Sequence, residues 1–191
     1  LMIGLDGYES SIGDRLMVWH RWNGLAVLVL VVWRLLWGLS GPQQARFASF
    51  VQGPAAALHY ARRLWSGVSP RYLGHNPLGA LMIVALLAAL LAQTALGLFA
   101  TDDNDLTGGP LHRLVSERLN DRATGWHGRI FHFVLLPLVA LHIAANALYG
   151  VLKQEPLITA MITGRKPAGE YVDASTLVEA AHPWRTALVC L

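Results

Sequence analysis

The sequence predicts an all-helical integral membrane protein. Three apolar stretches support this prediction, namely Trp19–Leu39, Leu78–Ala100 and Ile130–Leu152, because about 20 apolar residues suffice to cross the hydrocarbon core of a bilayer as a helix. The composition agrees: hydrophobic residues make up 54% of the chain and charged residues 14%, with a mean hydropathy of +0.41, whereas an average soluble domain is about 25% charged. The seven tryptophans suit a protein with two interfacial belts.

The charged residues between the spans predict the orientation of the chain in the membrane. The segment Ser40–Asn76 has no acidic residue and four arginines: Arg46, Arg62, Arg63 and Arg71. The segment Thr101–Arg129 carries five acidic residues: Asp102, Asp103, Asp105, Glu117 and Asp121. Since cytoplasmic loops are rich in Lys and Arg, the first segment is predicted to be cytoplasmic and the second to lie outside.

The two ends of the chain are predicted to belong to further membrane helices. Leu1–Leu5 is interpreted as the tail of a preceding helix, and Arg185–Leu191 as the start of a following one. Residues 1–166 then form a single transmembrane domain, and residues 167–191 form a cytoplasmic tail that leads into the extra apolar helix.

The cytoplasmic segment is also predicted to contain a short amphipathic helix around Pro54–Trp65. Four apolar residues share one face of this helix: Leu58, Ala61, Leu64 and Trp65. Three basic residues point towards lipid headgroups: His59, Arg62 and Arg63. The positive charges of the chain, net +3, therefore indicate membrane lipid and not nucleic acid as a partner.

Histidines inside or beside the spans are the candidate functional residues. His20 begins the first span, and His127, His132 and His142 fall in or beside the third. Ionisable groups in such segments are costly and usually functional, and an imidazole avoids much of the cost when its nitrogen binds a metal. The pattern predicts a membrane-embedded metal or haem site. Because the single cysteine, Cys190, excludes a CxxCH motif and a thiolate-rich cluster site, a bound haem would be b-type.

The first span offers a ligand with space beside it. Gly24 stacks one turn below His20 on the same face of the helix and leaves room for a flat porphyrin. Arg34 lies near the inner end, roughly 40° from that face, where it could pair with a haem propionate. The alternatives are a snorkelling arginine at Arg34 and an interfacial, helix-capping histidine at His20.

The third span offers two ligands at different depths. His127 and His142 lie ~22 Å apart along a helix axis and differ by roughly 60° around it, a mismatch that a kink at Pro137 would reduce. This spacing suits two haems, one near each membrane face. His132 lies only ~15 Å from His142, so it is predicted to be a pocket or lipid-facing residue, with replacement of His127 as a ligand left open.

A succession of motifs along residues 16–166 resembles a known family. The motifs are His20-x-x-x-Gly24, Arg34-Leu35-Leu36-Trp37-Gly38, Gly41-Pro42, Ala45-Arg46-Phe47, Tyr72-Leu73-Gly74-His75-Asn76-Pro77-Leu78-Gly79, Gly97-Leu98-Phe99 with Asp102-Asp103, Gly109-Pro110-Leu111, Leu141-His142-Ile143-Ala144-Ala145 and Met161-Ile162-Thr163-Gly164-Arg165-Lys166. In this order they are similar to the bacterial membrane cytochrome b family that includes cytochrome b-561 and the cytochrome b subunit of nickel–iron hydrogenases.

The resemblance implies a four-helix bundle in the bacterial inner membrane that binds two b haems by bis-histidine ligation. The first helix of that bundle, with its ligand histidine, is largely absent from this chain. His20 and His127 would then share the outer haem, and His142 would hold the inner haem with a histidine outside this sequence. His75 would contact a propionate or a quinone, with a helix-capping role as the alternative.

The resemblance also implies a function in electron transport. Electrons would pass between the quinone pool, either ubiquinone or menaquinone, and a partner on the periplasmic side. That partner is expected to be a c-type cytochrome or a dehydrogenase or hydrogenase subunit, and the acidic loop Asp102-Asp103-Asn104-Asp105 could steer it. No catalytic side chain is predicted, because the redox chemistry would belong to the haems.

Two other functions remain open at this point. One is a terminal membrane oxidoreductase that acts on superoxide or a ferric chelate at an exposed haem. The other is a transporter subunit whose histidines relay protons, although the spans show no inverted repeat or paired broken helices.

Overall fold

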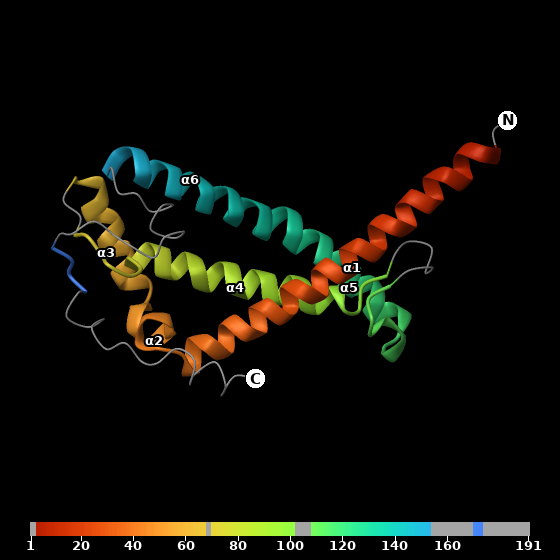
Figure 1. Cartoon of the computed structure of the whole chain (residues 1–191), viewed down its shortest axis with the longest axis horizontal. Helices are drawn as coiled ribbons and strands as arrows, with labels where there is room; N and C mark the ends of the chain where they lie inside the picture. The colour runs from red at the N-terminus through yellow and green to blue at the C-terminus, as the bar shows by residue number, and fades with distance from the viewer. Residues whose placement is uncertain (1–2, 68–69, 102–107, 154–169, 174–191) are drawn as a thin grey trace. The chain divides into compact units, whose positions relative to one another are not determined.

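The computed structural model describes residues 3–67, 70–101, 108–153 and 170–173, and these residues are predominantly helical. In chain order the helices are α1 (Ile3–Ser40), η1 (Gln43–Ala45), α2 (Phe47–Phe50), α3 (Pro54–Trp65), α4 (Pro77–Gly97), η2 (His112–Leu114), α5 (Glu117–Ile130), the π-helix η3 (Phe131–Leu135) and α6 (Leu136–Lys153), as Figure 1 shows. Within the described ranges, β-pairing is limited to an isolated bridge between Thr101 and Gly108. The predicted all-helical class is confirmed.

Three helical segments are long and apolar enough to cross a membrane: Arg15–Ser40, Pro77–Gly97 and Glu117–Gly150. They confirm the three predicted spans, but the third begins earlier than expected. Glu117–Arg129, predicted as part of an outer loop, is helical and runs on into the apolar span. Its charges lie on exposed positions while Asn120 and Ala123 are buried, so a scan for apolar length does not detect this amphipathic start.

The first span also begins differently. Leu1–Leu5 was expected to end a separate helix, but α1 runs from Ile3 to Ser40 without a break. The polar stretch Asp6–Arg15 contains no proline, so no residue in it obliges a helix to stop. Leu1, Met2, the residues of Arg185–Leu191 and the acidic loop 102–105 lie outside the described residues, and the domain boundary at residue 166 stays a prediction.

The chain divides into two compact units. One unit combines Leu1–Val32 with Ala88–Leu136, and the other combines Trp33–Leu87 with Pro137–Leu191. The candidate ligands divide with them: His20 and His127 belong to the first unit, and His142 belongs to the second.

In the second unit, the turn after α1 is packed against the end of that helix. A Cβ at Gly38 would collide with the Phe47 ring, so the ring sits directly on the helix backbone. The Arg34 guanidinium lies 4.9 Å from the centre of the same ring, and its Nη1 donates to the Ala45 carbonyl at 3.4 Å. Arg46 Nε donates to the Gly41 carbonyl at 2.7 Å. Two of the family-like motifs thus build this turn.

The predicted amphipathic helix is confirmed as α3, with the same bounds. Ala57 and Tyr60 are buried, and the Tyr60 hydroxyl shares a hydrogen bond with the Tyr149 hydroxyl of α6. The apolar face predicted from the sequence is divided in the structure. Ala61 and Leu64 are half-buried, whereas Leu58 and Trp65 are exposed.

The helix α4 begins at Pro77, directly after Asn76. The Asn76 side-chain oxygen accepts the Gly79 N–H at 2.8 Å, and the Asn76 carbonyl accepts the Ala80 N–H at 2.8 Å. Asparagine is among the preferred residues for capping a helix N-terminus. Asn76 therefore occupies the capping position of α4, and the two roles predicted for His75 stay predictions.

Substitution of Gly38 by alanine is expected to destabilise the protein. Crowding the Phe47 ring costs about 1–3 kcal/mol, which outweighs the gain of about 1 kcal/mol in helix propensity. Thermal unfolding in detergent, followed by circular dichroism, measures the change. Gly150→Ala is the control, because a Cβ there meets nothing within 4 Å. Equal behaviour of the two variants would contradict the packing argument.

Candidate functional site

His127 is held on α5 in a defined ring orientation. Its Nδ1 lies 2.9 Å from the backbone carbonyl of Gln93 on α4. A carbonyl only accepts hydrogen bonds, so Nδ1 carries the proton and Nε2 carries the lone pair. Histidines that bind metals commonly donate their second ring nitrogen to a carbonyl in this way.

Gly97 allows this contact. A Cβ at Gly97 would lie 3.0 Å from Cε1 and 3.3 Å from Nδ1 of His127. Any larger residue would therefore push the imidazole away from α4. The sequence flagged Gly97 as part of a motif but did not link it to His127. It gave no sign of Gln93 as a partner, because the contribution of Gln93 is a backbone carbonyl.

His20 and His127 lie close together in the first unit. Their ring centres are 5.9 Å apart and their planes are nearly perpendicular, at 84°. A metal ion bound by one nitrogen of each ring, at about 2 Å, places two imidazole centres about 6 Å apart. A metal bound to an imidazole nitrogen lies in the plane of that ring, so two ligand rings can take any angle to each other, including the 84° seen here. The distance between the two ring centres is therefore compatible with two ligands of one haem.

The surroundings of the pair leave space and unmet hydrogen-bonding capacity. A Cβ at Gly24 would meet nothing within 4 Å, which agrees with the predicted room for a porphyrin. Two buried side-chain oxygens in this unit, Gln93 Oε1 and Asn120 Oδ1, have no hydrogen-bond partner among the described residues. Buried acceptors of this kind are normally satisfied by ordered water or a ligand.

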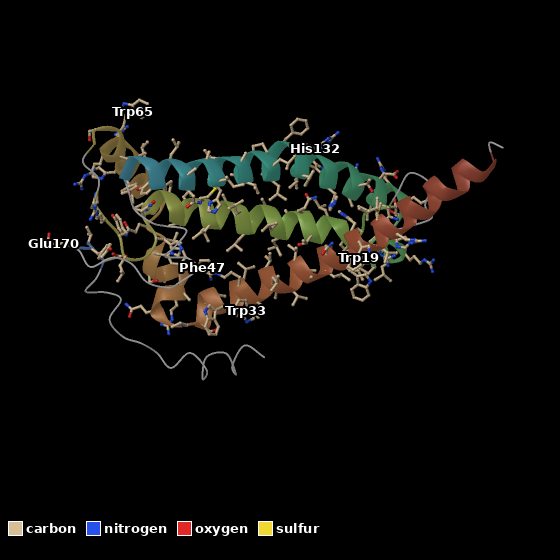
Figure 2. The ribbon with its side chains drawn as sticks, turned by 45° about the horizontal axis from the view of Figure 1, so that its top comes forward. Trp19, Trp33, Phe47, Trp65, His132 and Glu170 are labelled. Atoms are coloured by element: carbon tan, nitrogen blue, oxygen red, sulfur yellow. The ribbon has the colours of Figure 1, made fainter. Side chains whose placement is uncertain are left out.

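His132 does not join the pair. It is exposed, as Figure 2 also shows, and its Nδ1 lies 2.8 Å from the Gly128 carbonyl one turn back on its own helix. His127, and not His132, is the histidine that the structure brings beside His20. The geometry thus favours His127 of the two candidates.

The third span is not a regular α-helix. The Leu136 N–H bonds to the Phe131 carbonyl five residues earlier, which closes the π-helix η3 directly before Pro137. Proline lacks the N–H that would continue the α-helical pattern. The estimate of roughly 60° between His127 and His142 assumed 100° per residue throughout, so it does not hold across η3. Single π-helical turns inside helices occur frequently at functional sites.

His142 lies in the second unit, half-buried on α6. The Asn146 side-chain amide nitrogen is 3.2 Å from His142 Nε2 and 2.8 Å from the His142 carbonyl. An amide nitrogen donates, so Nε2 holds the lone pair here too. A metal at Nε2 would take the place of Asn146. No group of three or more His, Cys, Asp or Glu side chains that could hold a metal ion occurs in the described part of the chain.

The other two predicted residues have contacts within the second unit. Arg34 contacts Phe47 and Ala45, as described above, so its predicted contact with a propionate would add to a structural role. The His75 ring packs against the Phe50 ring, with the ring centres 4.9 Å apart and the planes tilted by 39°. The loop before it is tied to Asp173, whose carboxylate accepts the N–H groups of Leu73 and Gly74 at 2.6 and 2.7 Å.

Three helices long and apolar enough to span a membrane and two neighbouring histidines between them are typical of membrane haem proteins. A family model described as prokaryotic cytochrome b561, the nickel-hydrogenase cytochrome b type, matches residues 2–164. The chain belongs to this family of membrane cytochromes, which bind b-type haem and transfer electrons. Comparisons with curated proteins and with solved structures gave no match.

Substitution of Gly97 by alanine is expected to weaken haem binding at His127, because the added methyl group displaces the imidazole. Crowding of this kind costs about 1–3 kcal/mol, which corresponds to a fivefold to hundredfold loss of affinity. Haem content by pyridine haemochrome and the low-spin EPR signals measure it. Gly125→Ala is the control, since a Cβ there meets nothing within 4 Å, and an equal loss in the control would overturn the assignment.

Substitution of His142 by alanine is expected to remove one haem and to leave the spectrum of the other largely unchanged. The two ligand sets lie in different units, so the loss of one need not disturb the other. Reduced-minus-oxidised spectra at low temperature resolve the two haems. Survival of both haems would show that His142 is misassigned.

Proposed function

We propose that this protein carries electrons between a membrane quinone and a redox partner on the periplasmic side, using two b haems. The observation that carries the proposal is the His20–His127 pair, whose ring centres are 5.9 Å apart. Membership of the cytochrome b561 family supports haem as the occupant.

In this proposal His20 and His127 would hold the outer haem. The Gln93 carbonyl holds the His127 ring in the tautomer with its lone pair on Nε2. Gly97 lets the ring approach α4, and Gly24 leaves the face of α1 open beside His20. Haem bound there would supply a one-electron redox centre whose potential depends on its axial ligands and burial.

His142 is the proposed ligand of the inner haem, together with a histidine outside this sequence. Its Nε2 lone pair supports this role. Arg34 and His75 belong to the same unit as His142, which is compatible with contacts to a propionate or to a quinone. Ligands at two depths on one span would provide a relay across the membrane.

The partner is proposed to be a c-type cytochrome or a dehydrogenase or hydrogenase subunit of a membrane redox complex. The quinone would be ubiquinone or menaquinone. The second candidate function is a terminal oxidoreductase that acts on superoxide or a ferric chelate. The exposure of the His20 side chain favours it, because an accessible outer haem could react directly with a small molecule.

Rapid mixing of the purified holoprotein with a quinol tests the proposal. The quinol is expected to reduce the haems, and addition of the candidate partner is expected to reoxidise them. Because the segment 102–105 carries three aspartates, the rate with a basic partner should fall as salt rises.

The two candidate functions give different results in this experiment. Haems that a quinol cannot reduce and a quinone cannot oxidise would exclude the quinone-linked function. Reduction of such haems by superoxide would establish the small-molecule enzyme instead. Holoprotein carrying His142→Ala serves as the matched variant, since it should break the relay while retaining the outer haem.

A further inference from the structure

The helix α3 has three distinct sides. Counting from Ala57 at about 100° per residue, Tyr60, Ala61 and Leu64 lie within about 60° of it, and these are its buried or half-buried residues. Leu58 and Trp65 lie at about 80–100° and are 54% and 93% exposed. The basic residues Arg62, His59 and Arg63 follow at about 140–240°, and all three are exposed.

The side of α3 that carries Ala57 and Tyr60 is packed against the rest of its unit, so the apolar side with Leu58 and Trp65 and the basic side stay exposed. Ala57 and Tyr60 are only 2% and 3% exposed. The Tyr60 hydroxyl bonds to that of Tyr149, and the Tyr72 ring meets the Tyr60 ring edge-on at 5.7 Å. The helix is also limited in length, because Gly53 and Gly67 on either side of it adopt positive φ angles of 87° and 77°, which favour glycine.

The exposed apolar side of α3 lies at the level where the membrane spans end. α3 lies in the connection between α1 and α4, both long and apolar enough to cross a bilayer, so it lies near a membrane surface. Trp65 points away from the ribbon at the end of α3 in Figure 2. Tryptophan is enriched at the boundary between headgroups and acyl chains.

The charged side indicates which lipids this boundary contains. The segment 40–76 carries four arginines and no acidic residue. Arg62 lies one turn from Leu58, so its charge sits beside the apolar side and at headgroup height. Each basic residue near an anionic membrane surface contributes about 1 kcal/mol of attraction.

We propose that α3 is an interfacial helix that binds anionic phospholipids, with Leu58 and Trp65 in the acyl boundary and Arg62 and Arg63 on the phosphates. The buried tyrosine contacts orient the helix for this task. The proposal concerns a surface apart from the candidate haem ligands and is independent of the proposed function.

The depth of Trp65 provides the first test. In nanodiscs, the full chain with Cys190→Ser and Trp65→Cys carries a nitroxide at position 65. Quenching by oxygen is expected to exceed quenching by a water-soluble nickel chelate, as at an acyl boundary. A label that reacts mainly with the chelate would overturn the proposal, and so would a label shielded from both by a second copy of the chain.

Lipid preference provides the second test. Spin-labelled phosphatidylglycerol and phosphatidylcholine are compared for association with wild type, with Arg62→Gln/Arg63→Gln, and with Arg118→Gln/Arg122→Gln on α5. The control removes equal charge from another pair of exposed helical arginines. Preference for phosphatidylglycerol is expected to fall about fivefold per arginine in the α3 variant, and to vanish in about 1 M salt. An equal fall in the control, or none in either, would overturn the proposal.

Discussion

The hydrogen bond from His127 Nδ1 to the Gln93 carbonyl is the interaction on which the candidate site depends. A backbone carbonyl has two lone pairs, so Gln93 can accept this bond without giving up its place in α4. The bond selects the tautomer, directs Nε2 away from α4 and requires glycine at position 97. A second contact ties α5 to the segment that follows α4, because the Thr124 hydroxyl accepts the Thr101 N–H at 3.0 Å and lies 3.2 Å from the Thr101 carbonyl.

The sequence predicted well those features that depend on average properties of long segments. Apolar length identified the three spans, and the pattern of Pro54–Trp65 identified α3 with its bounds. It failed where a helix is polar or irregular. The charged residues of α5 obscured the helical start of the third span, and the π-helix η3 beside Pro137 is a local change in backbone hydrogen bonding that apolar length does not reveal. The sequence also could not identify the Gln93 carbonyl as the partner of His127, since every residue has a backbone carbonyl.

Several residues of the family-like motifs make packing contacts or hydrogen bonds within the second unit. Gly38 and Arg34 together receive the Phe47 ring, and Arg46 closes the turn on Gly41. Asn76 caps α4. A motif reports that several positions are constrained together, but packing and ligand binding constrain glycine, arginine and aromatic residues in similar ways. Distances to neighbouring atoms are needed to separate the two causes.

The first unit contains a group of polar residues beside otherwise apolar spans. Asn120, Thr124 and His127 share one face of α5, since residues four and seven apart align on a helix. Asn120 and Gln93 are each 8% exposed, and each has a side-chain oxygen without a partner among the described residues. A buried acceptor left unsatisfied costs about 1–3 kcal/mol, and polar groups in a span usually face the interior or a watery cavity. Ordered water or a bound group in this unit would supply the donors that these two oxygens accept from.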